Sequence, residues 1–161
     1  MKKYILEIKW ALTFVVVSLL WMLLEKLTGL HSEHISKHPT YTNFFAIPAV
    51  AVYVFAFLDK QKKSYQGIMT YKQGLKTGII ITIIIAILSP ITQSISSLII
   101  TPEFFPNVIE YSVTKGLMSV EEAKSFFNLK NYVIIATLGS LIMGVITTIV
   151  VAFFTKSNNS N

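Results

Sequence analysis

The chain has 161 residues, of which 53% are hydrophobic and 14% charged, and its mean hydropathy is +0.61. Soluble domains carry about 25% charged residues, so this composition excludes an ordinary soluble domain. The absence of cysteine excludes disulfide frameworks and thiolate metal sites. The net charge of +6 comes from lysine alone, and without arginine nucleic-acid recognition is disfavoured. We therefore predict one all-α membrane domain over residues 1–161.

Four apolar stretches predict four membrane-spanning helices, because a bilayer is crossed by about 20 predominantly apolar residues. They lie at about residues 8–30, 40–59, 74–100 and 131–154. The basic start before the first stretch is also typical of a signal peptide, but no small-residue cleavage site follows it, so we predict an uncleaved span. The fold expected is an integral membrane four-helix bundle.

Glu25 is the most informative residue of the first span, because an ionisable side chain at membrane depth is a functional-site hypothesis. Ser18 and Glu25 share one helical face. If the span begins at Trp10, Glu25 lies about one turn below the outer surface. If it begins at Ile5, Glu25 lies in the interface instead, so both interpretations stay open.

Three histidines follow the first span, and two of them are spaced by four residues. They are His31, His34 and His38. In a helix, His34 and His38 would share a face, and histidine with carboxylate suits zinc or a similar ion. Pro39 restricts a helix there, and no diagnostic metal motif is present. We therefore expect solvated loop histidines, no resident metal and no other cofactor, with these three residues as candidate ligands.

The third stretch changes character at its midpoint. Its first half is an uncharged run rich in isoleucine, and Pro90 then predicts a kink. Ser89 and Gln93 share a face beside this kink, and Gln93 is the expected polar partner of Glu25. The alternatives are structural hydrogen bonds between helices or a polar cavity between the first and third spans that opens outward.

The connection over residues 102–130 is polar but patterned, so two short amphipathic helices are predicted there. Ser119 and Glu122 have the spacing of a capping box, and Thr70 is a predicted N-cap for the third span. The two short helices either lie in the membrane interface or form a lid packed on the bundle.

Small residues recur at four-residue spacing in the third and fourth spans, where they permit close helix packing. They are Gly74, Gly78, Ser140 and Gly144. We detect no catalytic motif and expect no catalytic residue, so we predict that the protein is not an enzyme.

The positive-inside rule predicts both termini in the cytoplasm. With that orientation nine lysines flank the spans inside and five outside. The inner set is Lys2, Lys3, Lys9, Lys60, Lys62, Lys63, Lys72, Lys76 and Lys156, and the outer set is Lys26, Lys37, Lys115, Lys124 and Lys130. The predicted arrangement is therefore four spans with both ends of the chain on the cytoplasmic side.

Five stretches of the chain are distinctive in their order and spacing: Trp21–His31, Tyr41–Ala49, Met69–Gly74, Leu88–Gln93 and Thr101–Tyr111. Together they resemble the small bacterial integral membrane proteins grouped as domain of unknown function 4199. The predicted location is therefore the bacterial inner (cytoplasmic) membrane. The resemblance implies four spans with a helical outer connection, and it transfers no chemistry. Its stretches contain Glu25, His31, Gln93 and Glu110, which makes these the first residues to mutate.

Three functions stay open from the sequence. The leading expectation is a non-enzymatic accessory or structural protein whose partners are the lipid bilayer and other membrane proteins or copies of itself, not nucleic acid. The second is an oligomeric transporter or channel subunit with a polar cavity near Glu25. The third is a membrane enzyme or metal-binding protein that uses Glu25 and the histidines.

Overall fold

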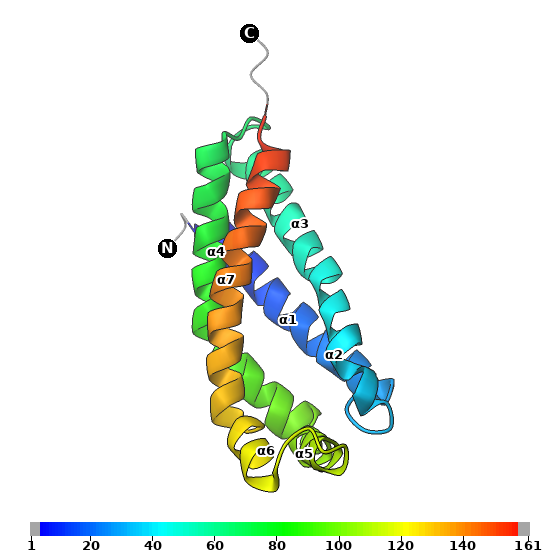
Figure 1. The fold of residues 1–161 in the computed structure, drawn as a ribbon. Coiled ribbons are helices and arrows are strands. Elements are labelled where there is room, and N and C mark those ends of the chain that lie inside the picture. Colours follow the sequence, from blue (N-terminus) through cyan, green and yellow to red (C-terminus); the bar gives the residue numbers. More distant parts are fainter. Residues whose placement is uncertain (1–3, 158–161) are drawn as a thin grey trace.

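The computed structural model describes residues 4–157, and within them every regular element is helical. Four long helices are joined by shorter ones (Figure 1). The long helices are α1 (Ile5–Leu27), α3 (Ala46–Ser64), α4 (Tyr71–Ile95) and α7 (Leu129–Thr155), and the short α-helices are α2 (His38–Tyr41), α5 (Phe104–Thr114) and α6 (Val120–Phe126). Two 3₁₀ turns, η2 (Ile35–Lys37) and η3 (Thr42–Phe45), flank α2, and a π-helical segment, η4 (Ser96–Ile100), continues α4.

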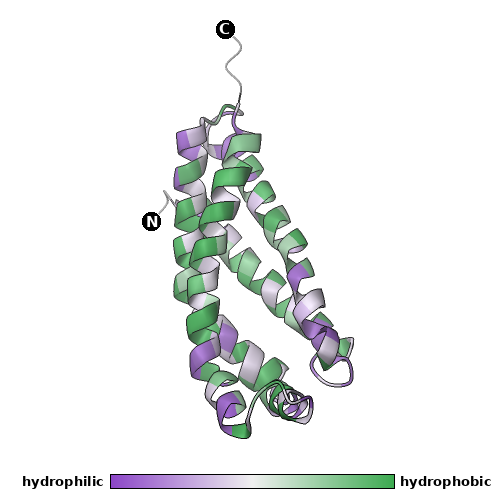
Figure 2. Cartoon of the chain, viewed as in Figure 1, coloured by the Kyte–Doolittle hydropathy of each residue, from purple (hydrophilic) through white to green (hydrophobic). Residues whose placement is uncertain are grey.

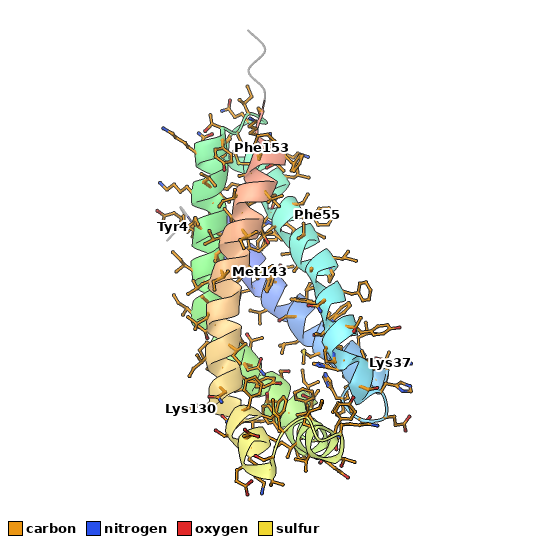
Figure 3. All side chains as sticks on the ribbon, viewed as in Figure 1. Tyr4, Lys37, Phe55, Lys130, Met143 and Phe153 are labelled. Atoms are coloured by element: carbon orange, nitrogen blue, oxygen red, sulfur yellow. The ribbon has the colours of Figure 1, made fainter. Side chains whose placement is uncertain are left out.

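Four helical segments are long and apolar enough to cross a membrane. They are Ile5–Leu27, Ile35–Ser64, Tyr71–Ile100 and Leu129–Thr155. Hydrophobic residues dominate the middle of the long helices, and hydrophilic residues gather toward their ends (Figure 2). Side chains such as Phe55 and Met143 point away from the bundle, as lipid-facing residues do (Figure 3). The predicted four-helix membrane bundle is therefore confirmed.

Helices α4 and α7 lie side by side along much of their length (Figure 1). Small residues permit this approach, because a Cβ built on Gly78 would lie 2.4 Å from Thr148 Cγ2. A Cβ on Gly144 would lie 2.5 Å from Thr82 Cγ2. Gly74 faces Ala152 in the same interface, whereas the hydroxyl of Ser140 bonds within its own helix, to the carbonyl of Thr137.

Helices α1 and α3 pack on the α4–α7 pair through a buried core. Ala11 of α1, Phe57 of α3 and Ile81 of α4 are almost completely buried there. The hydroxyls of Tyr53 and Thr82 lie 2.8 Å apart within this core. Because buried polar atoms need partners in an apolar interior, this pair links α3 to α4 by a satisfied hydrogen bond.

The predicted caps are present. Thr70 and Gln73 form a capping box at the start of α4, and Ser119 and Glu122 form one at the start of α6. The hydrogen bonds from the Ser119 backbone N–H and hydroxyl hold the pKa of Glu122 below its usual value. Residues 102–130 therefore hold two ordered helices, as predicted.

The second span, expected at about residues 40–59, extends over Ile35–Ser64, and the end of the first span also differs from the sequence prediction. The first span was expected to continue to residue 30, but α1 ends at Leu27 because Gly29 has a φ of +73°. The N–H of Leu30 reaches the carbonyl of Glu25 at 3.0 Å, and that of Gly29 reaches the carbonyl of Lys26 at 3.0 Å. This is the Schellman arrangement, which favours glycine at the left-handed position and reverses the chain.

We call the end of the bundle that holds His31–His38, α2, α5 and α6 the histidine end. Figure 1 places it opposite the C-terminus. The labelled Lys37 and Lys130 both lie at this end (Figure 3). At the opposite end, the hydroxyl of Ser157 accepts a hydrogen bond from the Met69 backbone N–H, which ties the end of the chain to the α3–α4 connection.

Candidate functional site

A carboxylate and two imidazoles converge at the histidine end. Nε2 of His31 lies 3.0 Å from Oε2 of Glu25, and Nε2 of His38 lies 3.5 Å from the same oxygen. The side chain of Glu25 is 1% exposed, that of His31 5% and that of His38 19%. One ligand atom from each of the three residues lies within 4.8 Å of the other two. We call these three residues the Glu25 cluster.

Local chain geometry builds this cluster from three segments. Glu25 lies in the last turn of α1, and the reversal at Gly29 returns His31 over it. The chain then passes through η2, and His38 begins α2 with Pro39 as its second residue. Proline is well accommodated in a first helical turn because its missing N–H is not needed there. Two turns thus bring together residues that are 6 and 13 positions apart.

Neighbouring side chains hold and cover the cluster. The indole N–H of Trp21 donates to Oε1 of Glu25, which leaves Oε2 facing the histidines. The ring of Phe104, at the start of α5, lies with its centroid 5.0 Å from each imidazole. Nδ2 of Asn107 donates to the backbone carbonyl of His31 at 2.8 Å. Helix α5 therefore closes over the cluster and keeps it away from solvent.

A cavity of about 270 Å³ opens beside Glu25. Its walls are mostly apolar and aromatic, with a few polar side chains. It is lined by Trp21, Leu24, Glu25, Thr28, Leu30, His34, Lys37, Tyr41 and Phe44. Pockets of this kind, with apolar walls and few polar groups, are typical ligand sites. His34 thus lines the cavity and stays outside the Glu25 cluster.

The other sequence candidates are placed apart from the cluster by their hydrogen bonds. Nε2 of Gln93 donates to the Ser97 hydroxyl at 2.9 Å, within its own span, and the structure gives no contact between Gln93 and Glu25. The hydroxyl of Ser18 donates to the Val15 carbonyl, and Ser89 is buried on α4. The partners of Glu25 are instead histidines, so the structure groups these residues differently from the sequence analysis.

Phe104 and Asn107 were not singled out as site residues by sequence reasoning. Both lie in Thr101–Tyr111, one of the stretches that carried the family resemblance. Nothing in helical periodicity indicates that this stretch folds back 76 positions onto His31. The sequence feature that could have indicated this contact is the aromatic pair Phe104 and Phe105 beside Pro106, in a connection that is otherwise polar.

A second buried charge lies on the same helix. Oε1 of Glu7 lies 2.8 Å from Nζ of Lys60, with the two side chains 2% and 10% exposed. Glu7 and Glu25 are 18 residues apart, which is about 27 Å and five whole turns, so they share a face of α1. Nearby, Asp59 pairs with Lys63 at 2.8 Å and accepts from the Trp10 indole N–H at 3.0 Å.

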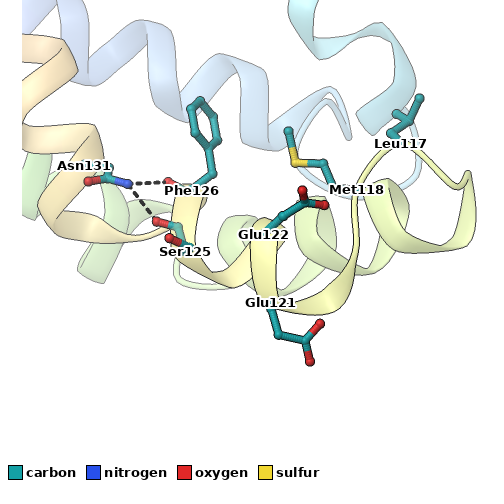
Figure 4. Close-up of a pocket in the computed structure, with 7 residues that line it drawn as sticks. All are labelled: Leu117, Met118, Glu121, Glu122, Ser125, Phe126 and Asn131. Carbon is teal, nitrogen blue, oxygen red and sulfur yellow. Dashed lines mark hydrogen bonds between the residues drawn. The ribbon is translucent and has the colours of Figure 1, made fainter.

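A larger hollow of about 700 Å³ lies against α6 (Figure 4). Two of its polar side chains already have structural partners. Nδ2 of Asn131 donates to the carbonyls of Ser125 and Phe126 at 2.8 and 3.2 Å. Glu122, which also lines it, caps α6 through Ser119. The hollow is therefore a consequence of the α6–α7 turn, and the Glu25 cluster is the better candidate site.

The fold and these contacts define a multi-pass all-α membrane protein with a buried carboxylate–histidine cluster at one end of its bundle. Residues 9–157 match the family model described as protein of unknown function (DUF4199), so the chain belongs to this family. No curated protein and no solved structure matches the chain. The geometry of the site itself must therefore carry the functional argument.

Proposed function

We propose that this protein is a non-enzymatic accessory component of the bacterial inner membrane that receives a small ligand at its histidine end. Both termini lie in the cytoplasm, so the histidine end faces outward. The observation that supports ligand binding is the convergence of His31 and His38 on one oxygen of the buried Glu25, beside a cavity of about 270 Å³. Burial of ionisable groups is expensive, and such groups mark functional sites in membrane proteins.

The proposed partners are other proteins of the bilayer. Helix α7 supports this. In its apolar 18-residue stretch, 11% of the residues are buried inside the protein, as in α1, compared with 33% in the span that contains α4. A Cβ on Gly139 would meet nothing within 4 Å, so this small residue leaves room for a close approach. Helices associate in membranes through such small residues. A ligand on Glu25 would act on α1, which packs against α3 and α4.

The orientation is tested by cysteine labelling, which suits a chain without cysteine. Lys37→Cys and Lys62→Cys place single thiols at exposed positions on opposite ends of the bundle. In intact cells a membrane-impermeant maleimide should label Lys37→Cys and leave Lys62→Cys unlabelled until the cells are opened. The reverse labelling pattern would contradict the proposed topology.

The accessory role is tested by photo-crosslinking in the native membrane. A photoreactive residue at Leu138, which is 55% exposed on α7, should give discrete protein adducts. The yield of these adducts should change in Glu25→Gln and stay unchanged in Glu33→Gln, since Glu33 is an exposed carboxylate at the same end that belongs neither to the cluster nor to the cavity wall. Adducts with lipid alone, or equal adduct yields in the two variants, would contradict the proposed accessory role.

A transporter or channel subunit is the second candidate, and one specific observation favours it. Buried carboxylates lie at both ends of one face of α1, and the Tyr53–Thr82 hydrogen bond is buried in the core. Ionisable and polar groups inside a bundle are typical of ion or proton paths. Purified protein in sealed proteoliposomes should then conduct protons or cations above the level of Glu25→Gln, and equal leakage would exclude this alternative.

A further inference from the structure

We propose that Glu25, His31 and His38 bind a divalent transition-metal ion, and that Zn²⁺ is the ion that fits best. This inference rests on the proposed function, because it names the ligand that the histidine end receives. The proposed metal site consists of the Glu25 cluster and the cavity beside it, and the hollow against α6 is not part of it. His34, although a sequence candidate, takes no part in the proposed coordination.

The spacing of the ligand atoms is close to what the ion requires. Zinc binds imidazole nitrogen at about 2.0–2.1 Å and carboxylate oxygen at about 2.0–2.2 Å. In a tetrahedral site, bonds of that length place neighbouring ligand atoms about 3.3–3.5 Å apart. Oε2 of Glu25 lies 3.0 Å from Nε2 of His31 and 3.5 Å from Nε2 of His38. Small side-chain adjustments would therefore admit an ion between the three atoms.

The charge balance also favours a cation. In the described part of the chain, the ion pairs of Glu25 are with His31 and His38, whereas the lysine pairs belong to Glu7 and Asp59. A carboxylate that is 1% exposed needs a compensating charge, because an unpaired buried charge is very costly. Two neutral imidazoles and one divalent ion would supply that compensation directly. Histidine and carboxylate ligands are deprotonated when they bind metal.

The chemistry of the donors selects the class of ion. Two imidazoles with one carboxylate form a donor set that zinc and other first-row divalent metals accept. Calcium takes six to eight oxygen ligands, and magnesium requires near-octahedral oxygen coordination, so this set suits neither. Three protein ligands leave one tetrahedral position free. Because Glu25 also lines the cavity, a water molecule or small solute from the cavity would complete the coordination.

The support around the ligands indicates an exchangeable ion. Metal-bound histidines ordinarily donate their second ring N–H to an acceptor, and loss of such a partner weakens binding about 10–100-fold. Nδ1 of His31 is buried and has no hydrogen-bond partner in the described structure. His31 is held instead by the ring of Phe104 and by the bond from Asn107 to its carbonyl. We therefore expect reversible binding.

The test is equilibrium binding of Zn²⁺ to the full-length protein in detergent, purified with a tag that contains no histidine. Chelator competition and elemental analysis after dialysis would give affinity and stoichiometry. Wild type and His34→Ala should each bind one equivalent with equal affinity. Affinity should fall by more than about 10-fold in each of Glu25→Gln, His31→Ala and His38→Ala. Loss of a hydrogen-bond partner of a metal ligand already costs at least that much, and these variants remove a ligand itself.

Helical circular dichroism and thermal melting of every variant would separate loss of a ligand from loss of fold. Tetrahedral Co²⁺ provides a second readout, because its visible absorption bands should form in wild type and His34→Ala and be lost in His38→Ala, the most exposed of the three ligands. Binding of no more metal than in Glu25→Gln, or an equal loss in His34→Ala, would overturn the inference. In that case, Glu25-dependent photo-crosslinking from Leu138 would still support the accessory role with a different ligand.

Discussion

The two ends of α1 carry buried carboxylates with different partners. Glu7 lies 2.8 Å from the ammonium group of Lys60. Glu25 faces two imidazoles, whose nitrogens can bind metal. Glu25 lines a cavity, and Glu7 lines neither of the two cavities described above.

This contrast separates a structural ion pair from the proposed ligand site. The Glu7–Lys60 pair fastens the start of α1 to the end of α3 through Oε1 of Glu7, whereas Oε2 of Glu7 is buried with no hydrogen-bond partner in the described structure. The Glu25 cluster joins the end of α1 to α2 and, through Phe104, to α5. A ligand at Glu25 would therefore change contacts among three segments, whereas the Glu7–Lys60 pair would be unaffected.

The largest effect is expected from breaking the Glu7–Lys60 pair. Lys60→Met leaves Glu7 buried without its ammonium partner, and such a change typically costs about 3–5 kcal/mol. Denaturant titration of the protein in mixed micelles should show this loss of unfolding free energy. A Lys62→Met variant is the matched control, since Lys62 is exposed on the same helix. Equal unfolding free energies of the two variants would contradict a structural role of the Glu7–Lys60 pair.

The next largest effect should come from metal bound at the Glu25 cluster. At a Zn²⁺ concentration about 100 times the dissociation constant, the folded state should gain about 2.7 kcal/mol. The gain should be seen in wild type and in His34→Ala, and it should disappear in His31→Ala. Thermal melts with and without Zn²⁺ measure it. If His31→Ala gained as much as wild type, the two ends of α1 would no longer differ in function.

Close packing between α4 and α7 should respond less strongly. Gly78→Ala would place Cβ 2.4 Å from Thr148, so the helices must shift, at a cost of about 1–3 kcal/mol. Gly139→Ala adds the same methyl group to α7 where nothing lies within 4 Å, and should instead stabilise the helix by about 0.5–1 kcal/mol. The two denaturation midpoints should therefore move in opposite directions.

The smallest effect concerns the cap of α6. Hydrogen bonds from Ser119 lower the pKa of Glu122, so their contribution to stability is present above the unfolded-state pKa and is lost as the pH falls through the lowered value. Ser119→Ala removes the hydroxyl but keeps the backbone N–H, so it should raise the pKa of Glu122 part of the way toward its ordinary value. NMR titration of the Glu122 carboxyl group in micelles measures this, and an unchanged pKa would contradict the capping interaction.

The architecture could be predicted from the sequence because its causes are local. Apolar length set the four spans, and side chains three residues apart set the caps at Thr70 and Ser119. Close helix contacts followed the same logic, since Gly78 and Gly144 do meet threonines of the opposite helix. The end of α1 was the exception, because the left-handed turn at Gly29 ended the helix before the apolar pattern did.

The grouping of the site residues could not be predicted in the same way. Glu25 and the histidines were each singled out, but helical spacing paired His34 with His38, and the expectation of polar contacts between spans paired Glu25 with Gln93. The structure instead joins Glu25, His31 and His38, because a turn rather than a helix connects them. Turn geometry and the return of α5 onto His31 depend on tertiary contacts, which have no period in the sequence.

X-ray absorption spectroscopy of the zinc-loaded protein tests the central contrast most directly. The bound zinc should show four nitrogen or oxygen ligands at about 2.0–2.1 Å, with the multiple-scattering pattern of two imidazoles that falls to one in His38→Ala. His34→Ala and Lys60→Met should leave the spectrum unchanged. A six-coordinate shell of oxygen alone, or a spectrum that His38→Ala does not alter, would contradict the assignment of Glu25 as a receptive metal site.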